Sequence, residues 1–289
     1  MLKYRLLFGT LMTVFFTGVV IFDGWLDGSL TASAADDAPV QGTILFILVA
    51  AIIIPAQLEF SKLAAAKNLR IFTPVSIIAS LLFAGTWYCL QLIAIPPQIY
   101  LFFLAVFSLV GLFLYQYSLC GTSGVIANCG ANCFSIAYLG AFSAFVVAVR
   151  IDFGLWALLM FIFAVKSADI GAYAIGSLFG RHKFSPTISP GKTWEGMAGA
   201  VATAMVLSVS FAAASDIMNW FSAVIFGLCL AFIGQFGDLA ESMIKRDAEQ
   251  KHSADRVPGF GGILDIIDSP LLTAPAAYLF FMFTVKAPV

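Results

Sequence analysis

Residues 237–269 form the densest run of ionisable side chains in an otherwise apolar chain. Near its start, Asp238, Glu241 and Lys245 follow spacings of three and four residues, which place side chains on one face of a helix. A loop rich in glycine and proline follows, and such a backbone can approach a ligand closely. The spacing therefore predicts a helix that carries two carboxylates and an ammonium group into a glycine-rich loop.

The same run ends in two further carboxylates, Asp265 and Asp268, which lie one turn apart if this segment is helical. Carboxylates at both ends with cations between them suit a site that holds a divalent metal ion and phosphate together. The candidate metal ligands are Asp238, Asp265 and Asp268, and the candidate phosphate ligands are Lys245, Arg246 and Lys251. The alternative is a solvated loop with surface ion pairs, which contribute only a few tenths of a kcal/mol each.

A second candidate is the pair Lys166 and Asp169, which lies inside a long apolar segment. A charge at membrane depth costs roughly 2.5 to 3.5 kcal/mol on insertion scales, and such groups usually face a cavity. Their spacing allows the two side chains to meet on one side of a helix. The alternative is a neutralised pair that only packs the bundle.

A third candidate is the loop 181–196, which connects two apolar segments. Gly191-Lys192-Thr193 is similar to the end of a phosphate-binding loop. However, Pro186 occupies the position of a required glycine, and no strand precedes the loop. Lys192 on this Gly/Pro-rich loop remains a candidate phosphate ligand. The alternative is a basic loop that only sets the orientation in the membrane.

The elements that must position these residues are apolar. Of the 289 residues, 61% are hydrophobic and only 11% are charged. A soluble protein could not bury the apolar surface of so many hydrophobic side chains. We expect an all-α, polytopic integral membrane protein with about nine transmembrane helices. The predicted segments are 6–22, 42–60, 71–95, 98–117, 131–149, 155–179, 197–214, 220–239 and 270–286.

The distribution of cations predicts the orientation. With nine spans and a cytoplasmic N-terminus, most lysines and arginines lie in cytoplasmic loops, and Arg150 and Lys286 lie outside. The loops 181–196 and 240–269 then share the cytoplasmic side of the inner membrane. We expect residues 1–150 to form about five N-terminal transmembrane helices, and residues 151–289 to form a catalytic transmembrane region.

From about residue 165 to 275 the sequence resembles the CDP-diacylglycerol synthase (phosphatidate cytidylyltransferase) family. The family's C-terminal signature contains S-x-x-K-R, K-D, P-G-H-G-G and D-R-x-D. The residues that match it are Ser242, Lys245, Arg246, Lys251, Pro258, Gly259, Gly261, Gly262, Asp265 and Asp268. Upstream, the matching residues are Asp169, Ile170, Gly171, Ala172, Tyr173, Gly176, Ile188, Ser189, Pro190, Lys192, Thr193, Trp194, Glu195 and Gly196.

Three positions depart from that signature. His252 replaces the aspartate of K-D, Phe260 replaces the histidine of P-G-H-G-G, and Ile266 replaces the arginine of D-R-x-D. These changes remove a hydrogen-bonding or acid–base group and a candidate phosphate ligand. They bear on catalytic competence and substrate choice rather than on the fold.

The resemblance implies a Mg²⁺-dependent nucleotidyltransferase of phospholipid biosynthesis, which converts CTP and phosphatidic acid to CDP-diacylglycerol and pyrophosphate. It implies one or two Mg²⁺ ions on Asp238 and Asp265, with or without a monovalent cation, and catalytic roles for Lys245 and Asp268. The implied substrate-binding residues are Lys166, Asp169, Ser189, Lys192, Glu195, Ser242, Arg246, Lys251, Gly261 and Gly262. The implied partners are cytosolic CTP, inner-leaflet phosphatidic acid, membrane lipid and a second copy in a homodimer, with no nucleic acid.

Other readings remain open. The chain could be a related CTP-dependent lipid enzyme, such as an ether-lipid cytidylyltransferase or a polyprenol kinase. Phe260 and Ile266 also leave room for a catalytically impaired paralogue. A membrane transporter would use Lys166 and Asp169 as its coupling pair. Against this last reading, the charges are concentrated in loops, and no pair of broken repeats is visible.

Overall fold

A computed structural model describes residues 2–30, 37–250, 253 and 261–285, with side chains from residue 8 onward. Apart from isolated bridge residues, such as the pair Lys183 and Thr193, these residues form helices and connecting loops and no strand. The helices are α1 (Leu2–Leu26), α2 (Thr43–Ala66), α3 (Thr73–Ala84), α4 (Thr86–Leu92), α5 (Pro97–Cys120), α6 (Val125–Ser135), the π-helix η1 (Ile136–Ala141), α7 (Phe142–Phe179), α8 (Trp194–Ser215), α9 (Trp220–Asp247) and α10 (Leu264–Thr284). The expected all-α class is confirmed.

The number of apolar helices differs from the expected count. The described chain contains seven helices long and apolar enough to cross a membrane, or eight if α3 and α4, bent by 65°, form one span. Large apolar side chains on several of them are exposed, as expected for surfaces that face lipid. The chain is therefore a polytopic membrane protein, but the count of about nine is not confirmed.

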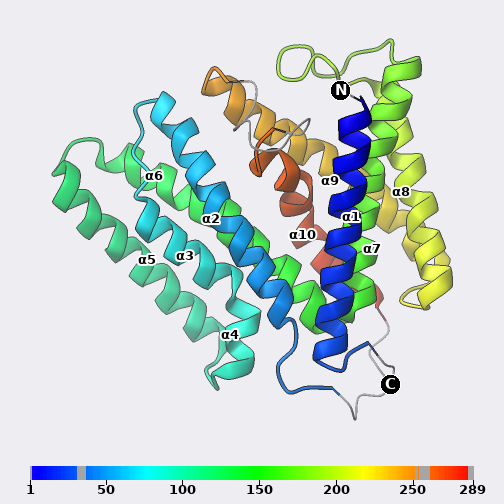
Figure 1. The fold of residues 1–289 in the computed structure, drawn as a ribbon. Coiled ribbons are helices and arrows are strands. Elements are labelled where there is room, and N and C mark those ends of the chain that lie inside the picture. The colour runs from blue at the N-terminus through cyan, green and yellow to red at the C-terminus, as the bar shows by residue number, and fades with distance from the viewer. Residues whose placement is uncertain (1, 31–36, 251–252, 254–260, 286–289) are drawn as a thin grey trace.

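The difference lies in the predicted segments 131–149 and 155–179, which fall in one helical run, Val125–Phe179. A straight helix of this length would measure roughly 80 Å, against about 30 Å for the bilayer core. The backbone leaves helical geometry at Gly154, where φ is 86° and ψ is 177°, a conformation that essentially requires glycine. Figure 1 shows α6 approaching the lower end of the bundle and α7 rising to its upper end, so the run changes direction.

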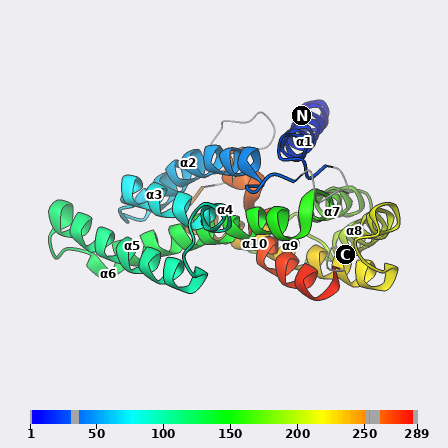
Figure 2. The same cartoon turned by 90° about the horizontal axis from the view of Figure 1, so that it is seen from below.

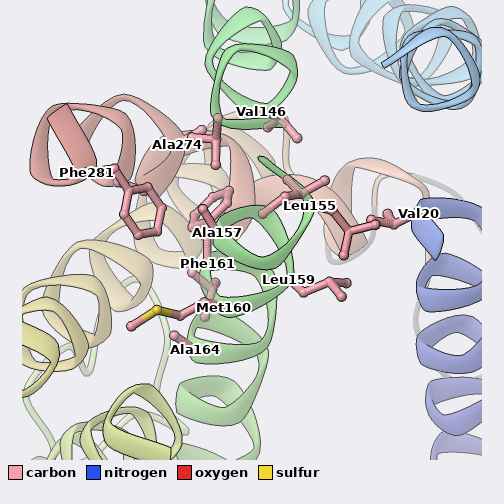
Figure 3. Close-up of a cluster of buried hydrophobic side chains, with 14 of the residues drawn as sticks. Val20, Val146, Leu155, Ala157, Leu159, Met160, Phe161, Ala164, Ala274 and Phe281 are labelled. Atoms are coloured by element: carbon pink, nitrogen blue, oxygen red, sulfur yellow. The ribbon is translucent and has the colours of Figure 1, made fainter. Parts of the chain in front are cut away.

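The main core surrounds α7, which packs against α8, α9 and α10. Figure 3 shows Met160 and Phe161 of α7 and Phe281 of α10 within this core, with Val20 of α1 at its edge. Seen from below in Figure 2, α5 and α6 lie at one end of a broad, flattened array, and α7 and α8 lie at the other. The helices α9 and α10 are thus held in the middle of the array.

The segments predicted to carry chemistry share one end of the bundle. In Figure 1, the loop between α7 and α8, the end of α9 and the beginning of α10 all lie at the upper end, near the N-terminus of the chain. The described residues that follow α1 and precede α2, 27–30 and 37–42, lie at the lower end. This arrangement agrees with the predicted placement of both loops on the side of the N-terminus, and the cytoplasmic assignment of that side remains a prediction.

A buried ion cluster ties the lower end together. Arg150 of α7 is fully buried, and its Nε donates to Asp23 at 3.0 Å and its Nη2 donates to Asp27 at 2.7 Å. Asp23 also accepts from the backbone N–H of Ile44, and Asp27 accepts from that of Gly42. One guanidinium therefore links α7 to the two carboxylates that hold the start of α2.

Replacing Arg150 with Met is expected to destabilise the protein by about 3 to 5 kcal/mol, because two buried carboxylates lose their cation. The measurement is the unfolding midpoint of the purified protein in detergent. Lys67→Met is the control. It breaks an exposed pair with Asp247 (Nζ–Oδ1 3.4 Å), which contributes about 1 kcal/mol or less. An Arg150→Met midpoint equal to that of the Lys67 variant would contradict this role.

Candidate active site

Three carboxylates from two neighbouring helices converge near the upper end of the bundle. Asp238 and Glu241 of α9 and Asp268 of α10 each place one carboxylate oxygen within 4.8 Å of the others. Glu241 and Asp268 are buried, and Asp238 is half-buried. The spacing of three on α9 puts the first two on one face, and the packing of α10 against α9 brings the third to them. We call these three residues the carboxylate group.

Two lysines reach the carboxylate group from different directions. The ammonium of Lys245, one turn along α9, contacts both Glu241 and Asp265. Lys192, from the loop before α8, lies 2.8 Å from Asp238 Oδ2 and donates to the Gln235 carbonyl at 2.9 Å. The side chains of both lysines are largely buried, so their charges act on the carboxylates with little screening by water.

The donor set fits a hard divalent cation. Glu241 is buried, and its Oε2 contacts the Lys245 ammonium, while its Oε1 has no hydrogen-bond partner within the described part of the chain. Buried carboxylates need cations or hydrogen-bond donors, and carboxylate oxygens are the ligands that Mg²⁺ prefers. The group therefore has the chemistry of a magnesium site.

Asp265 occupies a different place from the one expected for a metal ligand. One of its oxygens accepts from the Lys245 ammonium. The other accepts from Gly262 N–H at 2.8 Å and from the Ser253 hydroxyl at 3.0 Å. The carboxylate group thus contains Asp238 and Asp268, two of the three ligands that the spacing suggested, together with Glu241, and it does not contain Asp265. Direct ligation by Asp265 stays a prediction. Gly261, just before this turn, has a φ of 99°, which favours glycine.

Glu59 of α2 is a site residue that sequence reasoning missed. It is fully buried, and its Oε2 accepts from the Ser253 hydroxyl and from the Leu264 N–H, both at 3.1 Å. It therefore fixes the first turn of α10 and the segment that reaches Asp265. The signal was present in the sequence, because an acidic residue within the predicted span 42–60 is as unusual as Lys166.

The predicted pair Lys166 and Asp169 meets on α7, with Nζ 3.4 Å from Oδ2. Lys166 also donates to the carbonyl of Ile266 at 3.0 Å, and the Ser269 hydroxyl donates to Asp169 at 3.5 Å. Both contacts reach α10 on either side of Asp268. The pair therefore borders the carboxylate group, and each side chain is about one-third exposed.

Arg246 and Ser242, two further predicted residues, lie in the last turns of α9. Arg246 Nε donates to the carbonyl of Ile188, next to Ser189, at 3.2 Å, so the end of α9 touches the loop 181–196. Ser242 is half-buried on α9 beside Glu241. The predicted residue Lys251 and the departures His252 and Phe260 lie outside the described residues.

Glu195, in the first turn of α8, is engaged with its own loop. Its carboxylate accepts from the backbone N–H of Arg181 at 3.1 Å and pairs with His182 Nδ1 at 2.6 Å. Thr193 caps the same helix by accepting from Gly196 N–H at 3.1 Å. These bonds shape the loop that carries Lys192, and they give Glu195 a positional role within it.

Comparison with known proteins covers most of the chain. The family model described as "Cytidylyltransferase family" matches residues 38–284. The phosphatidate cytidylyltransferase of Haemophilus influenzae is 40% identical over 135 residues, which cover 45% of this chain and 47% of the relative. The corresponding figures are 39% over 127 residues (43% and 40%) for the Mycobacterium bovis enzyme of that name and 38% over 144 residues (49% and 54%) for that of Bacillus subtilis. The chain spans about half the length of the curated relatives it matches.

Glu241→Gln is expected to weaken Mg²⁺ binding by about tenfold, because ligand charge sets the affinity of oxygen sites. The measurement is the rise in unfolding midpoint as Mg²⁺ is titrated into the purified protein. Glu249→Gln is the matched control, since Glu249 is an exposed acid just beyond the end of α9. Equal Mg²⁺ dependence of the two variants would exclude Glu241 from the ion site.

Proposed function

The chain belongs to the cytidylyltransferase family, and we propose that it transfers the cytidylyl group of CTP to phosphatidic acid, forming CDP-diacylglycerol and pyrophosphate. The observation that carries this proposal is the carboxylate group beside Lys192, which lies within the matched residues. Relatives named phosphatidate cytidylyltransferase in three bacteria support the choice of substrate.

The reaction needs positioning and charge neutralisation more than it needs a base. A phosphate oxygen of the lipid forms a bond to the α-phosphorus of CTP, and the bond from that phosphorus to the pyrophosphate oxygen breaks. The attacking phosphate is already anionic near neutral pH, so no side chain has to remove a proton. Phe260 in place of the family histidine is compatible with this chemistry.

We assign the ion site to Asp238, Glu241 and Asp268. A bound Mg²⁺ supplies charge neutralisation at the phosphate oxygens. Lys245 contacts Glu241 and is itself held by Asp265, so these two residues position the carboxylate group from one side. This assignment gives Asp265 a positioning role through Lys245 in place of the direct ligand role expected from the sequence.

The cations around the group divide by position. Lys192 and Arg246 belong to the end of the bundle where the loops lie, which suits the triphosphate of a nucleotide arriving from the cytosol. Lys166 lies within the long apolar run and is partly exposed, which suits the phosphate of a membrane lipid. It also sits against the carbonyl of Ile266, the position where the family has arginine, and so supplies a cation there.

The purified protein with Mg²⁺, labelled CTP and phosphatidic acid is expected to form a CDP-lipid and release pyrophosphate. ATP in place of CTP should give no product. Asp238→Asn should reduce turnover by at least about 100-fold, because it weakens both the ion site and the contact with Lys192. Absence of product across several phosphatidic acids would contradict the proposal and favour the impaired paralogue.

Lys166→Met is expected to raise the KM for phosphatidic acid by about tenfold while the KM for CTP stays near the wild-type value, because one charged hydrogen bond to the lipid phosphate is lost. Steady-state kinetics in mixed micelles provide the measurement. Lys62→Met, which removes an exposed lysine of α2, is the control. An equal rise in both KM values would contradict the separate lipid role.

A further inference from the structure

The π-helix η1 contains a buried tyrosine, Tyr138, that has no role in the site described above. Tyr138 is 5% exposed, and its hydroxyl is shielded from solvent and makes no hydrogen bond within the described part of the chain. Its ring is held between Phe134 and Phe142, with centroid separations of 5.9 and 6.1 Å. A phenylalanine would fill the same space without burying an unpaired donor. We therefore expect the hydroxyl to form a hydrogen bond with a ligand.

The carboxylate group lies within electrostatic range of Tyr138. Tyr138 interacts electrostatically with Asp238, Glu241 and Asp268, all three members of the group. It also packs in one apolar cluster with Leu264 of the first turn of α10. The ring therefore approaches the group from η1, on the N-terminal side of the chain, where the sequence indicated only apolar spans.

The Tyr138 hydroxyl lacks a hydrogen-bond acceptor and Oε1 of Glu241 lacks a donor within the described residues. Tyr138 is a buried donor, and Oε1 of Glu241 is a buried acceptor, since Oε2 already contacts Lys245; within the described residues the two do not bond to each other. Buried polar groups are nearly always satisfied by protein, water or ligand. A ligand that lies between them, with a cation facing Glu241 and an oxygen facing the hydroxyl, satisfies both.

We propose that Tyr138 is a further binding residue of the site, whose hydroxyl donates a hydrogen bond to an oxygen atom in the coordination shell of the ion held by Asp238, Glu241 and Asp268. That oxygen belongs either to a bound water or to a substrate phosphate. The wider turn of the π-helix fits this role, since an inserted residue re-aims the side chains beside it, and such turns occur frequently at functional sites. The inference rests on the proposed function for the identity of the site.

The test compares Tyr138→Phe with Tyr117→Phe, which removes a hydroxyl from an exposed position on α5. Mn²⁺ binding to the purified full-length protein is followed by the electron paramagnetic resonance of free Mn²⁺, with no nucleotide or lipid present. KM values for CTP and phosphatidic acid are then measured. If the oxygen is water, Tyr138→Phe weakens Mn²⁺ binding by about tenfold. If it is a phosphate oxygen, Mn²⁺ binding is unchanged and one KM rises by about tenfold.

Three further results would decide against the inference. Wild-type levels of both Mn²⁺ affinity and KM in Tyr138→Phe would overturn it, as would a wild-type protein that binds no Mn²⁺. Stability without ions separates binding from packing: the variant should unfold at or above the wild-type midpoint, and a lower midpoint would show that the hydroxyl supports the fold instead. Weakened Mn²⁺ binding in a protein that forms no CDP-lipid would overturn the proposed function and leave the ion-shell role of Tyr138 intact.

Discussion

The convergence of three carboxylates beneath the surface of an apolar bundle is the constraint on which the rest of the site depends. Like charges at this separation repel, and burial weakens the screening that water would supply. Asp238, Glu241 and Asp268 therefore require cations close by. Lys192 and Lys245 supply two of these, and Oε1 of Glu241, which has no partner among the described residues, leaves room for a third.

The fold meets this constraint by drawing on both halves of the chain. Glu59 of α2 fixes the start of α10, and α10 carries both Asp265 and Asp268. The expected division into an N-terminal region and a catalytic region at residue 150 stays a prediction. Two observations bear on it: α7 runs across that boundary, and the buried core joins Val20 to Phe281. In the described chain the helices before residue 150 thus contribute to the site itself.

The sequence predicts the helical class, the loops and the pair Lys166–Asp169, because charges in an apolar chain stand out and helical spacing sets which side chains meet. It could not distinguish Asp265 from Asp268 as members of the carboxylate group. The two lie one turn apart, and only the packing of α9 against α10 decides which one faces Asp238.

The spacing of residues in the sequence could not predict two further features, the role of Tyr138 and the number of helices. Tyr138 was not recognised because a tyrosine in an apolar span is typical of a core residue. Only its hydroxyl, which has no hydrogen-bond partner among the described residues, distinguishes it from an ordinary core residue. The helix count was uncertain for a related reason. The break at Gly154 arises from the backbone conformation of that residue. A glycine within an apolar run does not by itself predict such a break.

The most direct test of the proposed ion site is the position of a divalent ion in the protein itself. Crystals grown with Mn²⁺ and a non-reactive CTP analogue would locate the ion by its anomalous scattering. We predict a peak within coordination distance of Asp238, Glu241 and Asp268, with the Lys245–Asp265 contact intact beside it. A peak on Asp265 that leaves Glu241 without an ion would contradict it.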